Sequence, residues 1–154
     1  MNRPRGWIQD SGSIENLIKV VELFDKKSET HNNLINVLIP LRIKDSSLRQ
    51  QLIEELKQPQ ISFFTLVGSR TPNNKVDSII QCLIEGQNRL GIVNWACDNF
   101  VRFAYTLNFI AYNKLKDAFY ITDFGLLLSR ALTTNEKFEV IKTALKKYYS
   151  AKMI

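Results

Sequence analysis

The sequence predicts a mainly helical domain that carries a small β-hairpin, arranged as a winged helix-turn-helix. Three observations lead to this fold class. Apolar residues recur at helical spacing in several segments, and many of these segments follow a capping residue. Two helical segments, 76–86 and 95–107, are separated by a short turn. Two short β-like runs, 109–112 and 119–121, come directly after them, in the position that the wing occupies in this fold.

The first half of the chain contains two clear helical patterns. The first is predicted to run to about Lys26, with its apolar stripe at Ile14, Leu17, Ile18, Val21 and Phe24. Residues 28–44 read as a loop followed by an apolar segment that Pro40 stops. Asp45, Ser46 and Ser47 are N-cap candidates for the second helix, which should end before Pro59. Its apolar stripe is Leu48, Leu52, Ile53 and Leu56. Residues 61–67 read as a short strand or a buried loop, and residues 68–75 as an exposed loop.

The second half of the chain provides the helix-turn-helix pattern. Gly86 closes the helix predicted from Val76, and Asn94 caps the helix predicted over 95–107. The inner face of the latter should hold Phe100, Phe103, Ala104 and Leu107. The hairpin follows, with residues 113–118 as a basic tip. A further helix is predicted over 123–132. The last helix should follow a capping box at 133–136 and run to about Tyr149.

Length and composition define the class of protein. The chain has 154 residues, which suits one domain, since roughly 100–200 residues per domain is usual. Its composition is that of a globular protein, and no apolar run approaches the roughly 20 residues of a membrane span. The N-terminus does not resemble a signal peptide, and two cysteines do not make a disulfide framework, so we expect a reduced cytoplasmic protein. The formal net charge of +6 fits nucleic-acid binding and also fits a merely soluble surface.

A winged helix-turn-helix predicts which residues would read DNA. A helix fits the major groove, and the hairpin beside it can reach the phosphates. The candidate reading residues cluster at the start of the second helix and before it: Gln87, Asn88, Arg89, Asn94 and Trp95. Lys114 and Lys116 at the hairpin tip suit phosphate contacts. The alternative is that these are polar turn residues on a solvated face, with Trp95 in the core.

Segments along nearly the whole chain resemble the FokI family of type IIS restriction endonucleases. The similarity begins at 6–9 and continues through 15–17, 20–25, 31–32, 39–40, 66–68 and 77–81. It is densest in 94–95, 100–104, 107–110 and 119–125. In that family, three winged-helix subdomains recognise DNA and a separate nuclease domain cleaves it. The resemblance implies that residues 13–150 are the first recognition subdomain, residues 1–12 a DNA-contacting arm, and residues 151–154 the start of a linker. The parent enzyme would be much longer.

The resemblance also assigns DNA contacts. It implies that this subdomain reads part of a GGATG-type site in the major groove, with Gln9 and Asp10 of the arm facing bases. Asp10 departs from the family's amide, and a carboxylate cannot donate to adenine. Arg70 is our choice for the guanine-reading arginine, and Lys75 is the second choice. If Arg70 reads the guanine, we expect Lys75 to contact a phosphate. Gln87 and Trp95 match the family's residues at the turn and the helix start. Arg3 and Arg5 complete the candidate phosphate contacts.

Catalytic residues of the family are not apparent in this chain. The family's nuclease centre holds Mg²⁺ on carboxylates beside a lysine. Glu55 and Lys57 have part of that spacing, but they are predicted on the solvated face of a helix. His31 has no partner histidine or cysteine for zinc, Cys82 reads as core, and no base stands near Cys97 in sequence. We therefore expect no catalytic centre, metal or cofactor in this chain, and Mg²⁺ only in the absent nuclease domain.

The predicted function is double-stranded DNA recognition within a FokI-like enzyme. The expected partners are DNA and the other recognition subdomains and nuclease domain of the parent, with no membrane, and the piece alone should be a monomer. Two rival interpretations remain open. One is a stand-alone winged-helix regulator, which would show a self-complementary apolar patch and a palindromic site. The other is a protein-interaction module that uses the winged helix only as a scaffold.

Overall fold

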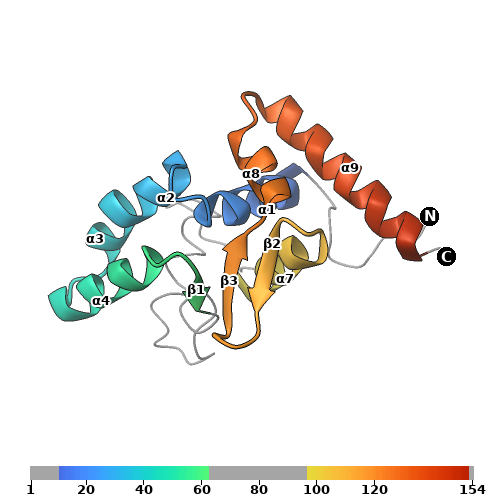
Figure 1. Cartoon of the computed structure of the whole chain (residues 1–154). Coiled ribbons are helices and arrows are strands. Elements are labelled where there is room, and N and C mark those ends of the chain that lie inside the picture. The colour runs from blue at the N-terminus through green and yellow to red at the C-terminus, as the bar shows by residue number, and fades with distance from the viewer. Residues whose placement is uncertain (1–10, 63–96, 153–154) are drawn as a thin grey trace.

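The computed structural model of the chain describes residues 11–62 and 97–152 (Figure 1). In these ranges the chain is mainly helical and carries a small antiparallel sheet, as predicted. The elements before the gap are α1 (Ser11–Leu23), α2 (Glu29–Asn33), the π-helical turn η1 (Leu34–Leu38), α3 (Ile39–Arg42), α4 (Ser46–Leu56) and β1 (Ile61–Ser62). Those after it are α7 (Cys97–Thr106), β2 (Ile110–Asn113), β3 (Ala118–Ile121), α8 (Asp123–Arg130) and α9 (Thr134–Lys152).

Helix α1 lies at the centre of the core because its apolar residues bury against both α7 and α8. Leu17, Val21 and Leu23 have almost no exposed surface. Full burial of one such side chain contributes about 1.5–3 kcal/mol. The predicted inner face of α7 is confirmed, since Phe100, Phe103, Ala104 and Leu107 are all buried. Helix α1 ends at Leu23, three residues before the predicted end at Lys26, with i→i−3 bonds at its close.

The segment 28–44 is the main local correction, because it is helical for most of its length. Ser28 caps α2 by accepting a hydrogen bond from the His31 backbone N–H, and η1 and α3 follow without a break. Pro40 does not stop the segment, since it lies in the first turn of α3. A proline removes an N–H and crowds the preceding turn. The π-helical turn η1 comes directly before α3 and ends two residues before Pro40.

The predicted hairpin is confirmed, with each strand shifted by about a residue, and it belongs to a three-stranded sheet. Strand β3 lies in the middle, with β2 on one side and β1 on the other. The register pairs Tyr112 with Phe119 and Ser62 with Ala118. Residue 61 therefore begins a strand, the first of the two alternatives for 61–67. Residues 63–67 of that segment, like the predicted helix 76–86, lie outside the described ranges.

Helix α7 is followed by a residue with a positive φ, and this conformation directs the chain into the hairpin. Asn108 adopts a positive φ of 67°, which asparagine tolerates better than most residues. The Asn108 N–H bonds to Tyr105 O, and the Phe109 N–H bonds to Ala104 O. This is the Schellman pattern of helix termination. Phe109 is thereby placed in the core, where its ring stacks on Phe124 with centroids 4.9 Å apart.

Helices α8 and α9 close the fold on the side away from the hairpin tip (Figure 1). Thr122 caps α8 by accepting from the Gly125 N–H, and its own hydroxyl donates to Asn108 O over 2.7 Å. Helix α8 ends at Arg130, two residues before the predicted end. Thr133 accepts a hydrogen bond from the Glu136 N–H, which confirms one half of the predicted capping box. Helix α9 continues three residues beyond the predicted end, to Lys152.

Candidate nucleic-acid interface

The tip of the β2–β3 hairpin is held in one conformation by side chains of the hairpin itself. Asn113 Oδ1 accepts hydrogen bonds from the Leu115 N–H at 3.0 Å and the Lys116 N–H at 3.3 Å. This is the turn that asparagine favours by replacing a backbone carbonyl. The Tyr112 hydroxyl donates to the carboxylate of Asp117, which has a φ of 50°. The backbone between residues 113 and 117 is therefore fixed although the tip is exposed.

The tip is also anchored to the neighbouring strand. Asn113 Nδ2 donates to Gln60 Oε1 over 2.9 Å, so one side chain both shapes the turn and joins it to the residue before β1. Ser62, the last described residue before the gap, pairs with Ala118 beside the turn. The described chain before the gap therefore ends beside the hairpin turn.

Two cations and one apolar side chain occupy the tip. Lys114 and Lys116 are exposed, and neither has a carboxylate partner among the residues that the structure describes. The nearby carboxylate of Asp117 is engaged by Tyr112. That hydrogen bond is the main reason why the pKa of Tyr112 is raised. Between the lysines, Leu115 is 97% exposed. The tip therefore presents positive charge and apolar surface together.

Phe119 on β3 packs against two tyrosine rings, Tyr112 on β2 and Tyr105 on α7. The ring of Phe119 lies 5.0 Å from that of Tyr112 and 6.1 Å from that of Tyr105, measured between centroids. Phe119 is buried, whereas the two tyrosines are exposed. Aromatic pairs of this kind contribute about 0.5–1.5 kcal/mol beyond their burial. The contact with Tyr105 fixes the hairpin against α7.

The other predicted DNA-contacting residues lie outside the described ranges. Lys114 and Lys116 are the two that the structure places, and it brings them together on one turn. The remaining ones stay predictions from the sequence: Arg3, Arg5, Gln9, Asp10, Arg70, Lys75, Gln87, Asn88, Arg89, Asn94 and Trp95. The same holds for the predicted arm, 1–12, almost all of which precedes the described chain, and for Cys82.

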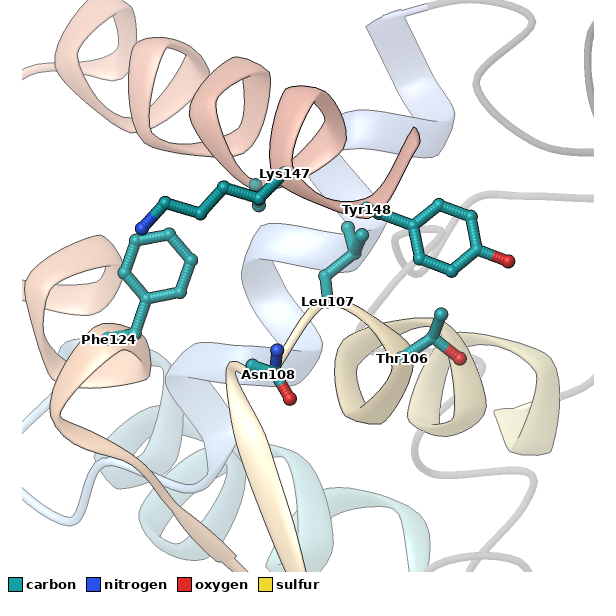
Figure 2. A pocket seen from close by; sticks show the side chains of 7 residues that line it. Thr106, Leu107, Asn108, Phe124, Lys147 and Tyr148 are labelled. Carbon is teal, nitrogen blue, oxygen red and sulfur yellow. The ribbon is translucent and has the colours of Figure 1, made fainter. Parts of the chain in front are cut away.

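A pocket of about 380 Å³ lies at the root of the hairpin, beside Asn108 (Figure 2). It is lined by Thr106, Leu107, Asn108, Phe124, Ala144, Lys147 and Tyr148. The Lys147 ammonium lies 5.3 Å from the centre of the Phe124 ring, in a cation–π contact. Figure 2 shows Lys147 and Tyr148 extending in opposite directions along α9. These lining residues include no carboxylate and no histidine.

Three of the residues considered for catalysis, His31, Glu55 and Lys57, lie in surroundings that are typical of residues with a structural role. His31 is buried, and its Nδ1 lies 2.8 Å from Leu23 O. Burial is the main cause that lowers the pKa of His31. Leu56 is buried between Glu55 and Lys57, as expected for an amphipathic helix. Within 11–62 and 97–152, no group of three or more His, Cys, Asp or Glu could hold a metal ion. No helix in these ranges is long and apolar enough to cross a membrane.

Sequence reasoning missed two contributors to the tip. The hairpin pattern predicts Asn113 only as part of the turn, although asparagine at the start of a tight turn is a signal for side-chain bonds to the backbone. Gln60 carried no local signal. Its partner lies 53 positions away and becomes its neighbour only when β1 joins the sheet.

The fold and the hairpin define a class of protein: a mainly helical binding module with a cationic β-hairpin. The chain belongs to the family described as FokI, recognition domain, subdomain 1, which matches residues 3–131. It is 38% identical over 136 residues to the type II restriction enzyme FokI of Planomicrobium okeanokoites, covering 84% of this chain and 24% of FokI. It is 28% identical over 135 residues to the type II restriction enzyme StsI of Streptococcus sanguinis, covering 86% of this chain and 22% of StsI. The chain therefore spans about a quarter of the length of the curated relatives it matches.

Solved structures agree with this family assignment. The structure of restriction endonuclease FokI superposes with a TM-score of 0.74 and 35% identity, covering 96% of this chain and 26% of that one. The structure of FokI bound to DNA superposes with a TM-score of 0.73 and 35% identity, covering 95% of this chain and 27% of that one. The predicted mainly helical fold is confirmed by both matches. The described chain shows the helix and hairpin of the predicted winged helix-turn-helix, and the first helix and the turn lie outside it.

Proposed function

We propose that this chain is a sequence-specific double-stranded DNA recognition module of a FokI-like type II restriction endonuclease. The observation that carries the proposal is the match, over 95% of the chain, to a FokI structure bound to DNA. At 35% identity and a TM-score of 0.73, the two chains share a backbone on which equivalent surfaces can face the same ligand. The hairpin tip then serves as a wing.

In this proposal phosphate contacts position the module and base contacts specify the site. Lys114 and Lys116 on the wing bind phosphates and displace condensed counterions. Arg3, Arg5 and Lys75 are proposed to add to this term, in line with the formal net charge of +6. Base reading is assigned to Gln9, Asp10, Arg70, Gln87, Asn88, Arg89 and Trp95, from their residue types and from the family resemblance. A bidentate arginine–guanine or amide–adenine pair discriminates by about 1–3 kcal/mol.

Cleavage is assigned to another part of the parent enzyme. The relatives are restriction enzymes about four times as long as the region that they share with this chain. The proposed partners are the remaining recognition subdomains and a Mg²⁺-dependent nuclease domain. The residues in 11–62 and 97–152 do not fit a metal ion, so we derive no cleavage step from them. We propose that the module alone is a cytoplasmic monomer that binds DNA weakly, because it covers only part of a site.

The test is a fluorescence-anisotropy titration of the whole chain with a duplex containing GGATG and with a scrambled duplex, each at two salt concentrations. Tighter binding to GGATG is the expected result. Equal, strongly salt-dependent binding would contradict the GGATG-type site and leave general DNA contact. No binding to either duplex at low salt would overturn the proposed function and favour a protein-interaction scaffold.

Two substitutions distinguish a residue that reads a base from a residue that contacts a phosphate. Arg70→Ala is expected to relax discrimination at one base pair by about 1–3 kcal/mol. Lys114→Ala is expected to weaken binding to every duplex alike. If both substitutions changed specific and random binding by the same factor, the assignment of Arg70 to base reading would be wrong.

A further inference from the structure

We propose that the wing contacts DNA through an apolar side chain as well as through its cations. Leu115 packs against the deoxyribose surface of one strand, between phosphates bound by Lys114 and Lys116. This inference rests on the proposed function and adds an interaction surface to it, because the residue types alone assigned only charge to the tip.

The first observation is the unusual exposure of Leu115. It is 97% exposed and belongs to the turn that joins β2 to β3. The tip of this hairpin points away from α8 and α9 (Figure 1). A lone exposed leucine on a mobile loop would carry no argument, since single exposed apolar residues are common. Leu115 differs because its own N–H is bonded to Asn113 Oδ1 at 3.0 Å, and its neighbour Lys116 is bonded to the same oxygen.

The second observation is that the tip is preorganised at several points. Asn113 fixes the turn from inside, Tyr112 holds Asp117, and Gln60 holds Asn113 from the next strand. A side chain presented by an ordered backbone loses less entropy when it binds. The backbone of Leu115 is therefore already ordered in the folded chain, so less conformational entropy is lost when this side chain contacts a ligand.

The spacing of the cations fits one strand of DNA. Lys114 and Lys116 are two residues apart, so their Cα atoms are separated by at most about 7 Å. Successive phosphates on one strand rise by about 3.4 Å along the duplex axis. Two flexible ammonium groups at this spacing can reach neighbouring phosphates of a single strand. The leucine between them then faces the sugars that join these phosphates.

The charge of the hairpin tip indicates which ligand it binds. The tip offers two unpaired ammonium groups among the described residues, and its one carboxylate, Asp117, already accepts from Tyr112. A polyanion that also presents apolar surface matches this pattern, and the sugar-phosphate backbone has both properties. An anionic membrane shares the charge. One leucine buries too little apolar area to anchor a protein there, however, since even a whole myristoyl chain gives only marginal binding.

The test measures duplex binding by the whole chain over a range of salt concentrations, for wild type and Leu115→Ser. Leu132, which is 91% exposed beyond the end of α8, gives the matched control Leu132→Ser. We expect Leu115→Ser to weaken binding about three- to tenfold with an unchanged salt slope, because the lost contact is apolar. Leu132→Ser should leave binding unchanged. Thermal melting of both variants checks that each is folded.

The outcomes separate this inference from the function on which it rests. If wild type binds no duplex, the proposed function fails. If wild type binds and Leu115→Ser matches Leu132→Ser, only the Leu115 contact is overturned. A changed salt slope in Leu115→Ser would also overturn it, by showing that the substitution acts through the lysines. Vesicles of equal parts anionic and zwitterionic phospholipid complete the test, since Leu115-dependent binding to them without duplex binding would assign the tip to membranes instead.

Discussion

The buried carboxylate of Asp25 accepts a 2.7 Å hydrogen bond from the hydroxyl of Ser129, although 104 positions separate the two residues in sequence. The Arg130 guanidinium adds two bonds of 3.2 Å to the same carboxylate, and the Lys27 N–H adds another. Asp25 follows the end of α1, while Ser129 and Arg130 close α8. This carboxylate therefore fixes α8 against α1, and α8 in turn supports the root of the wing.

Asp25→Ala is expected to lower the free energy of unfolding by about 2 kcal/mol. The main cost is the hydroxyl of Ser129, which is only 9% exposed and would lose its acceptor, at about 1–3 kcal/mol. Urea unfolding of Asp25→Ala, Ser129→Ala and the double variant forms a double-mutant cycle. The double variant should lose less than the sum of the single variants. Strict additivity would contradict the interaction. Glu139→Ala, which removes an exposed pair with Lys142, should change stability little.

The Asp25 carboxylate should make the free energy of unfolding depend on pH in the acidic range. Burial acts to raise the pKa of Asp25, but hydrogen bonds from Arg130, Ser129 and the Lys27 N–H outweigh it, so the pKa lies below its ordinary value. A lowered pKa stabilises the fold above the unfolded value of about 3.9, and the gain disappears as pH falls through the folded value. The free energy of unfolding should therefore fall more between about pH 6 and about pH 3 in wild type than in Asp25→Asn. Equal losses in the two proteins would refute this role.

Gly125 is expected to tolerate no side chain. An added Cβ would lie 2.1 Å from Phe109 O and 2.6 Å from the side chain of Ile121. Phe109 O also accepts hydrogen bonds from Thr122, so it cannot move without disturbing the root of the wing. Gly125→Ala should destabilise the fold by about 2 kcal/mol or more, despite the higher helix propensity of alanine. Leu127→Ala, at a 58% exposed position of the same helix, is the control. Melting temperatures that match between the two variants would show that the contact relaxes freely.

Lys26 should make stability depend on pH in the alkaline range. Burial lowers its pKa to about 8, and its ammonium donates to Leu56 O over 2.6 Å. Since the unfolded lysine has a pKa near 10.4, the unfolded chain binds more protons between these values, and stability rises with pH there. Lys26→Met should remove this rise, which is at most about 1.4 kcal/mol per pH unit, whereas Lys27→Met at an exposed position should keep it. A slope that persists in Lys26→Met would exclude Lys26 as its source.

Local signals predicted most of the elements. Asp45 accepts from the N–H groups of Ser47 and Leu48, as its position before an apolar stripe indicated, and α4 ends before Pro59 as predicted. The hairpin strands and the inner face of α7 follow from alternating and helical periodicity, which are properties of adjacent residues. The error at Pro40 arose because a π-turn is not visible in local propensity, and it lets a helical segment pass a proline.

Tertiary partners could not be predicted in the same way. Nothing near Asp25 in sequence indicates that Ser129 will meet it, and nothing near Asn113 indicates Gln60. These contacts form only when distant elements pack. For the candidate interface, charge at the tip was visible in the pair Lys114 and Lys116, whereas the rigidity of the tip and the exposure of Leu115 required the structure.

The most direct test of the central claim, that this chain binds the phosphates of duplex DNA with its wing, is the salt dependence of duplex binding. Wild type is compared with a variant carrying Lys114→Gln and Lys116→Gln, and with a control carrying Lys142→Gln and Lys146→Gln on the exposed face of α9. Each lost phosphate contact lowers the magnitude of the slope of log K against log salt by about 0.9. We predict a slope lower by about 2 in the wing variant and unchanged in the control. Equal slopes in all three proteins would contradict the account.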